Sequence, residues 1–168
     1  MRPNASNLNV DRGSTRANQV IVPVSADGTI QFYNDAPMHL IVDVSGYYTT
    51  TDAPTSTSGL FVATVPVRLL DSRDAPGRPG TGCVARIVVP ATASAAVTTL
   101  TIADARKPGY ATMWPGGQGR PTTSSLNLDG VGQTRPNHSI VRLDGTHALQ
   151  VYVEPRGQVI VDLAGYFT

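Results

Sequence analysis

Short runs of alternating hydrophobic and polar residues recur along the whole chain, separated by turns rich in Gly, Pro, Asp and Asn. Such runs predict β-strands, because successive side chains of a strand point to opposite faces of its sheet. In the first third of the chain the predicted strands are 8–10, 19–24, 29–33 and 39–48. Asp27-Gly28 lies between the second and third of these and favours a hairpin turn there.

The rest of the chain continues this pattern and predicts about eight further strands, as in an antiparallel sandwich. The runs are 65–73, 84–89, 97–102, 110–114, 126–128, 139–143, 147–153 and 159–167. The sequence therefore predicts an all-β fold, either an antiparallel sandwich or a jelly-roll-like arrangement. A closed barrel fits the same turn spacing.

Part of the chain is repeated. Residues 29–49 align without a gap with 148–168, and the alignment places Asp43 on Asp162. Further back, 15–18 (Thr-Arg-Ala-Asn) aligns with 134–137 (Thr-Arg-Pro-Asn). This similarity predicts an internal repeat.

The two copies differ in what precedes them. The second follows roughly sixty residues that the first lacks, so we expect Met1 to begin in the middle of a module. The predicted division is a C-terminal half of a repeat module at 1–49, a Thr/Ser/Pro-rich linker at 50–60 and a complete β module at 61–168. The apolar face of a half-module has to be buried against another surface. That surface could belong to the rest of this chain, to another copy of it or to a neighbouring β module.

Composition removes several functional classes. The 168 residues carry a net charge of +1, which gives no electrostatic basis for binding nucleic acid or an anionic membrane. The single cysteine, Cys83, forms no internal disulfide and belongs to no metal-binding motif. No signal peptide follows Met1, and no apolar run approaches the length of a membrane span.

The sequence also lacks a recognisable catalytic pattern. His39, His138 and His147 are scattered and do not have the spacing of a zinc site. The carboxylate pair of a glycosidase usually includes a glutamate, and the only glutamate here, Glu154, lies beside a turn. We therefore expect no enzyme activity, no cofactor and no metal.

Two aspartates interrupt apolar strands. A buried carboxylate is costly unless it is paired, so Asp43 and Asp162 should each have a partner. Arg16 and Arg135 recur at matching places in the two copies, which favours a structural Asp–Arg or Asp–backbone network that fixes strand register. A ligand-binding carboxylate is the alternative.

A second group of charges lies near the start of the complete module. Arg68 and Arg73 flank Asp71, which predicts an Arg–Asp pair that holds the first strand of the module in place. A phosphate or sugar-acid site is the functional alternative.

Aromatic residues supply the candidate ligand-binding site. Trp114 leads into the Gly/Pro-rich loop 115–121, which makes it a candidate for an exposed residue that stacks on a sugar, with Tyr110 on the same strand.

Several segments are similar to a known module. They are 6–9 (Ser-Asn-Leu-Asn), 42–47 (Val-Asp-Val-Ser-Gly-Tyr), 66–73 (Pro-Val-Arg-Leu-Leu-Asp-Ser-Arg), 109–115 (Gly-Tyr-Ala-Thr-Met-Trp-Pro) and 161–167 (Val-Asp-Leu-Ala-Gly-Tyr-Phe). Together they resemble the β-rich repeat of secreted actinobacterial surface and cell-wall-associated proteins. The resemblance implies an extracellular, non-catalytic structural or assembly module of a cell or particle surface, or alternatively a carbohydrate- or cell-wall-binding accessory module. It identifies no binding residues.

Overall fold

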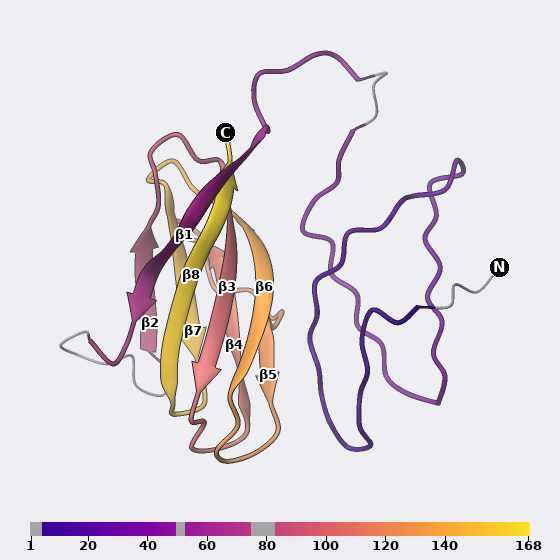
Figure 1. The fold of residues 1–168 in the computed structure, drawn as a ribbon, viewed down its shortest axis with the longest axis vertical. Helices are drawn as coiled ribbons and strands as arrows, with labels where there is room; N and C mark the ends of the chain where they lie inside the picture. Colours follow the sequence, from indigo (N-terminus) through magenta and orange to yellow (C-terminus); the bar gives the residue numbers. More distant parts are fainter. Residues whose placement is uncertain (1–4, 50–52, 75–82) are drawn as a thin grey trace.

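The computed structural model describes residues 5–49, 53–74 and 83–168, and all regular secondary structure within them is β (Figure 1). Every strand lies after residue 60. The strands are β1 (Phe61–Asp71), β2 (Cys83–Val88), β3 (Ala95–Ala103), β4 (Gly109–Pro115), β5 (Leu126–Leu128), β6 (Arg135–Arg142), β7 (Ala148–Val153) and β8 (Gln158–Phe167).

The eight strands form two antiparallel sheets. One has the order β1-β8-β3-β6 and the other β2-β7-β4-β5. The prediction of an all-β antiparallel sandwich is confirmed, and the two separate sheets replace the closed barrel that the turn spacing also allowed. This strand order is that of a jelly roll, in which the chain is wound as one long folded hairpin.

A consequence of this order is that the two halves of the module interdigitate. β8 pairs with β1 and β3, β6 with β3, β7 with β2 and β4, and β5 with β4. Each of these pairings joins one of the first four strands to one of the last four. Each half therefore depends on the other for its interstrand hydrogen bonds.

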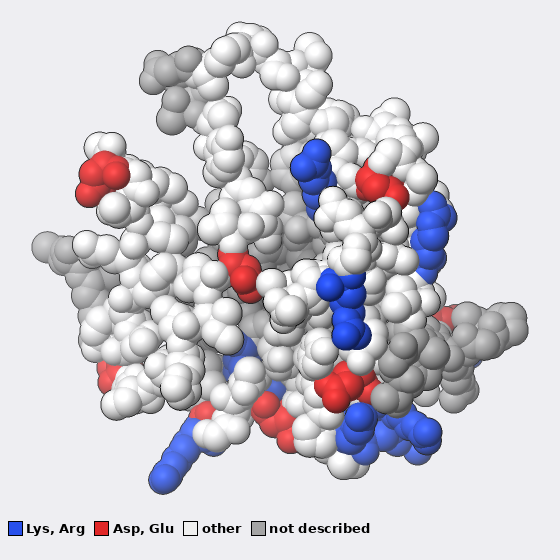
Figure 2. Space-filling model, turned by 180° about the vertical axis from the view of Figure 1, so that it is seen from behind, with Lys and Arg blue, Asp and Glu red and all other residues white. Residues whose placement is uncertain are grey.

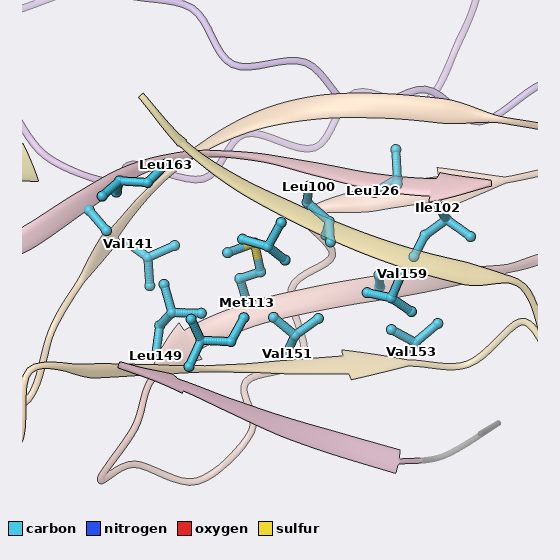
Figure 3. Packing of buried hydrophobic residues seen from close by; sticks show 14 of the residues in the cluster. Leu100, Ile102, Met113, Leu126, Val141, Leu149, Val151, Val153, Val159 and Leu163 are labelled. Atoms are coloured by element: carbon cyan, nitrogen blue, oxygen red, sulfur yellow. The ribbon is translucent and has the colours of Figure 1, made fainter. Parts of the chain in front are cut away.

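The core lies between the two sheets and follows the alternation of the sequence. Along β3, alternate residues from Ala96 to Ile102 are fully buried, while the residues between them are partly exposed. They face buried residues of the opposite sheet, above all on β7 (Figure 3). The larger aliphatic members of the cluster are Ile87, Val89, Leu100, Ile102, Leu126, Leu128, Val141, Leu143, Leu149, Val151, Val153, Val159, Val161 and Leu163.

Residues 5–49, called here the leading segment, behave differently. The strands expected at 8–10, 19–24, 29–33 and 39–48 are not formed, and this part of the prediction is wrong for the structure described. The hairpin turn between two of them is present: the Gly28 N–H donates to the Ser25 carbonyl at 2.9 Å, and Gly28 has a positive φ of 79°. A turn is held by neighbours in sequence, whereas a strand requires a partner at its side.

Truncation of a core side chain tests the placement of the core. Leu100→Ala removes a fully buried side chain and should lower the free energy of unfolding by about 2–5 kcal/mol. Leu40→Ala, in the leading segment, removes a side chain that is 49% exposed and should change it by no more than about 0.5 kcal/mol. Urea unfolding of both variants checks this, and equal losses would contradict the described core.

Candidate functional site

One polar cluster lies at the end of β1. The Asp71 side chain is only 5% exposed and is contacted by both flanking arginines. Arg73 Nε donates to Asp71 Oδ1 at 2.8 Å, and Arg68 Nη1 donates to Oδ2 at 3.0 Å. The side-chain hydrogen bond from Arg73 is the main reason that the pKa of Asp71 lies well below its usual value. The Asp71 carboxylate is thus already paired with arginines of the same chain, and these pairs hold the end of β1 in place.

Arg68 also links β1 to β8. The register of the two strands places it opposite Asp162, and Arg68 Nε donates to Asp162 Oδ1 at 2.9 Å. A second, longer bond joins Nη2 to Oδ2 at 3.4 Å. The partner of Asp162 is therefore Arg68, and the recurring Arg135 belongs to a different pair. Asp162 is 32% exposed, so this pair lies at the surface of the sheet.

The leading segment meets the module at the β5–β6 edge. Asp129 is the centre of this junction: Arg135 Nη2 donates to it at 2.8 Å, the Thr15 N–H donates at 2.9 Å, and Arg16 Nη1 lies 3.5 Å away. The two arginines, Arg16 and Arg135, line a hollow of about 330 Å³. The sequence pattern pointed to both arginines, but not to Asp129. Its alignment with Asp11, which also contacts Arg16 at 3.7 Å, was the signal for it.

Asp43, unlike its counterpart Asp162, is solvent-exposed and forms no ion pair within the described part of the chain. Its surroundings are exposed as well: Ile41 and Val44 are more than four-fifths exposed. The predicted network between Asp43 and Arg16 is thus not made. In the complete module, the corresponding carboxylate has a partner because β1 lies beside β8.

The leading segment presents a large apolar surface. Sixteen of the 23 exposed large hydrophobic residues of the described chain lie within it. In Figure 2, where this segment is on the left, few charged side chains interrupt that surface. An extended segment that exposes so many large apolar side chains is unusual in a folded protein, where most such residues are buried.

Trp114 is not the exposed stacking residue that the sequence suggested. It is 4% exposed, and its indole Nε1 donates to the Gln118 carbonyl at 2.9 Å. Its neighbour Met113 belongs to the core, so Trp114 points to the outer face of its sheet, where the following loop covers it.

Tyr110 is partly exposed and packs against Tyr152, with ring centroids 5.7 Å apart. The Arg120 guanidinium lies 3.9 Å from the centroid of the Tyr152 ring. Neither Tyr152 nor Arg120 was identified from the sequence. One face of the only aromatic pair on this sheet in the described residues is thus already occupied by a cation of the chain.

The histidines serve separate local contacts. His138 Nδ1 lies 3.2 Å from the Thr99 hydroxyl, and His147 Nδ1 lies 3.0 Å from the Ala93 carbonyl, while His39 is exposed. Within the described residues, no three metal-ligating side chains come together. The same residues include no helix that is long and apolar enough to cross a membrane.

Comparisons with known proteins were negative at every level. No protein-family model matches the chain, and neither a curated protein nor a solved structure is significantly similar to it.

The cluster around Asp71 predicts acid sensitivity. Its pKa lies below the unfolded value of about 3.9, so the ionised carboxylate stabilises the fold above that pH and loses this effect as the pH falls. Asp71→Asn should therefore be less stable than the unmodified protein at pH 7, and the difference should shrink below about pH 4. Urea unfolding at several pH values measures this. Asp104→Asn, in a surface ion pair with Arg106, is the control with little expected effect.

Burial of Trp114 can be measured directly, because it is the only tryptophan. The native protein should show blue-shifted fluorescence that acrylamide quenches poorly, and unfolding should shift the emission to the red and expose it to the quencher. Efficient quenching of the native protein would place Trp114 at the surface instead.

Proposed function

We propose that this chain is a non-catalytic structural module that assembles with other polypeptides by β-strand complementation, with the leading segment as the assembly element. The observation that carries this proposal is the exposed apolar surface of residues 5–49, which have the sequence pattern of strands and no sheet to join. Adding strands to such a segment satisfies backbone and apolar groups at once.

The polar clusters support a structural role. Asp71 and Asp162 are bound by arginines of the chain itself, and Asp129 joins the leading segment to the module. The location on the outside of a cell or particle is part of the proposal and is supported by the resemblance of the repeat to extracellular actinobacterial modules. A glycan-binding role has less support, because Trp114 is covered by its own loop and Arg120 occupies a face of Tyr152.

Light scattering tests the assembly proposal. The 168-residue chain should show a mass that rises with concentration, because its exposed apolar side chains associate with one another even where no complete sheet forms. A chain of residues 61–168 contains all eight strands and both sheets, and should remain a monomer. A 168-residue chain that stays monomeric at every concentration would contradict the proposal.

A further inference from the structure

The leading segment has the local geometry of the second half of the module without its sheets. An offset of 119 residues relates the turn at 25–28 to the turn at 144–147. The Gly28 N–H donates to the Ser25 carbonyl at 2.9 Å, and the His147 N–H donates to the Asp144 carbonyl at 3.0 Å. Both donors have positive φ, 79° and 51°. His147 adopts this unusual conformation at the position where the leading segment has glycine.

The residue after each turn also makes an equivalent hydrogen bond. The Thr29 N–H donates to Ser25 Oγ at 3.1 Å, and the Ala148 N–H donates to Asp144 Oδ1 at 3.1 Å. Ser25 and Asp144 thus accept the equivalent backbone hydrogen bond, although their side chains differ.

A third correspondence lies earlier in the two copies. Asn18 Nδ2 donates to the Asn7 carbonyl at 2.6 Å, and Asn137 Nδ2 donates to the Ser125 carbonyl at 2.7 Å. Several contacts that form within one copy are therefore present in both.

What the leading segment lacks is the set of neighbours that β5–β8 have. Residues 39–48 correspond to β8, which lies between β1 and β3, and residues 29–34 correspond to β7, which lies between β2 and β4. Since β5–β8 pair only with β1–β4, no rearrangement of the leading segment on its own can build either sheet. It requires four further strands that pair with it as β1–β4 pair with β5–β8.

A second copy of residues 1–168 does not meet this requirement. Each copy contains one β1–β4 set and two segments that need such a set, the leading segment and β5–β8. Any number of copies therefore leaves half of these segments without partners. A partner that completes the leading segment must supply its own strands.

We infer, on the basis of the proposed function, that the leading segment binds a polypeptide segment of the β1–β4 pattern from outside residues 1–168, and completes a second jelly-roll sandwich with it. The first strand of that partner lies beside 41–48 and carries an arginine opposite Asp43, as Arg68 lies opposite Asp162. The exposed, unpaired carboxylate of Asp43 is then the charge that sets the register of the incoming strand.

The probe is a copy of residues 61–118 joined directly ahead of residue 1 of the 168-residue chain. This junction reproduces the connection between β4 and β5, since Arg2 aligns with Arg120. We expect the extended chain to be a monomer, with hydrogen exchange of the amides at 41–48 slowed by about 100-fold or more relative to the unextended chain. Slow exchange at 160–163 in both chains reports that the original module is intact.

Matched variants test the register. In the extended chain, Asp43→Asn, or Arg68→Ala in the added copy, should speed exchange at 41–48 by about fivefold, as expected for a partly exposed ion pair. Asp104→Asn in the added copy should leave it unchanged.

Two results would overturn the inference. Amides at 41–48 that exchange equally fast with and without the added copy, while 160–163 stay protected, would show that β1–β4 strands do not complete the segment. A defined oligomer of the unextended chain with 41–48 already protected would identify a second copy as the partner and would leave the assembly proposal standing. An unextended chain that is always monomeric contradicts the assembly proposal, whatever the extension does.

Discussion

The hydrogen-bonding requirement of the peptide backbone governs this structure. An antiparallel strand directs its N–H and C=O groups sideways, and a core can form only where those groups find neighbours. Here the neighbours of each strand come from the other half of the module, with β8 between β1 and β3 and β7 between β2 and β4. Two stretches of similar sequence therefore reach opposite states. Residues 148–168 lie at the centre of two sheets, and residues 29–49 lie in water.

The alternation of hydrophobic residues was sufficient to predict the strands after residue 60 and the sandwich that they build. Their ends were less predictable: β1 begins at Phe61 and β6 at Arg135, each four residues before the predicted start. Arg135 and Asn137 are polar edge residues, and their ladder partners lie on β3. The strands of the leading segment were predicted by the same alternation and are absent. A hydrophobic pattern records which side of a strand would be buried, but not whether a neighbouring strand exists.

Among the candidate site residues, contacts between sequence neighbours were predictable, and contacts that depend on strand pairing were not. Arg68, Asp71 and Arg73 are neighbours in sequence, and their contact follows from that proximity. The pair between Arg68 and Asp162 spans 94 residues and depends on the register of β1 against β8, which no local pattern specifies. Trp114 was misjudged for a related reason. It points away from the core, and only the path of the loop to Gln118 determines that it is covered.

The position of β8 has a consequence for how the chain is made. β8 is the last strand of the module in sequence, yet it lies between β1 and β3, so this sheet cannot close until β8 has been synthesised. During that interval β1–β4 are already present, and the earlier-made leading segment has the sequence pattern of their missing neighbours. Until β8 has been made, the leading segment is therefore a covalently attached competitor for the places that β5–β8 occupy beside β1–β4.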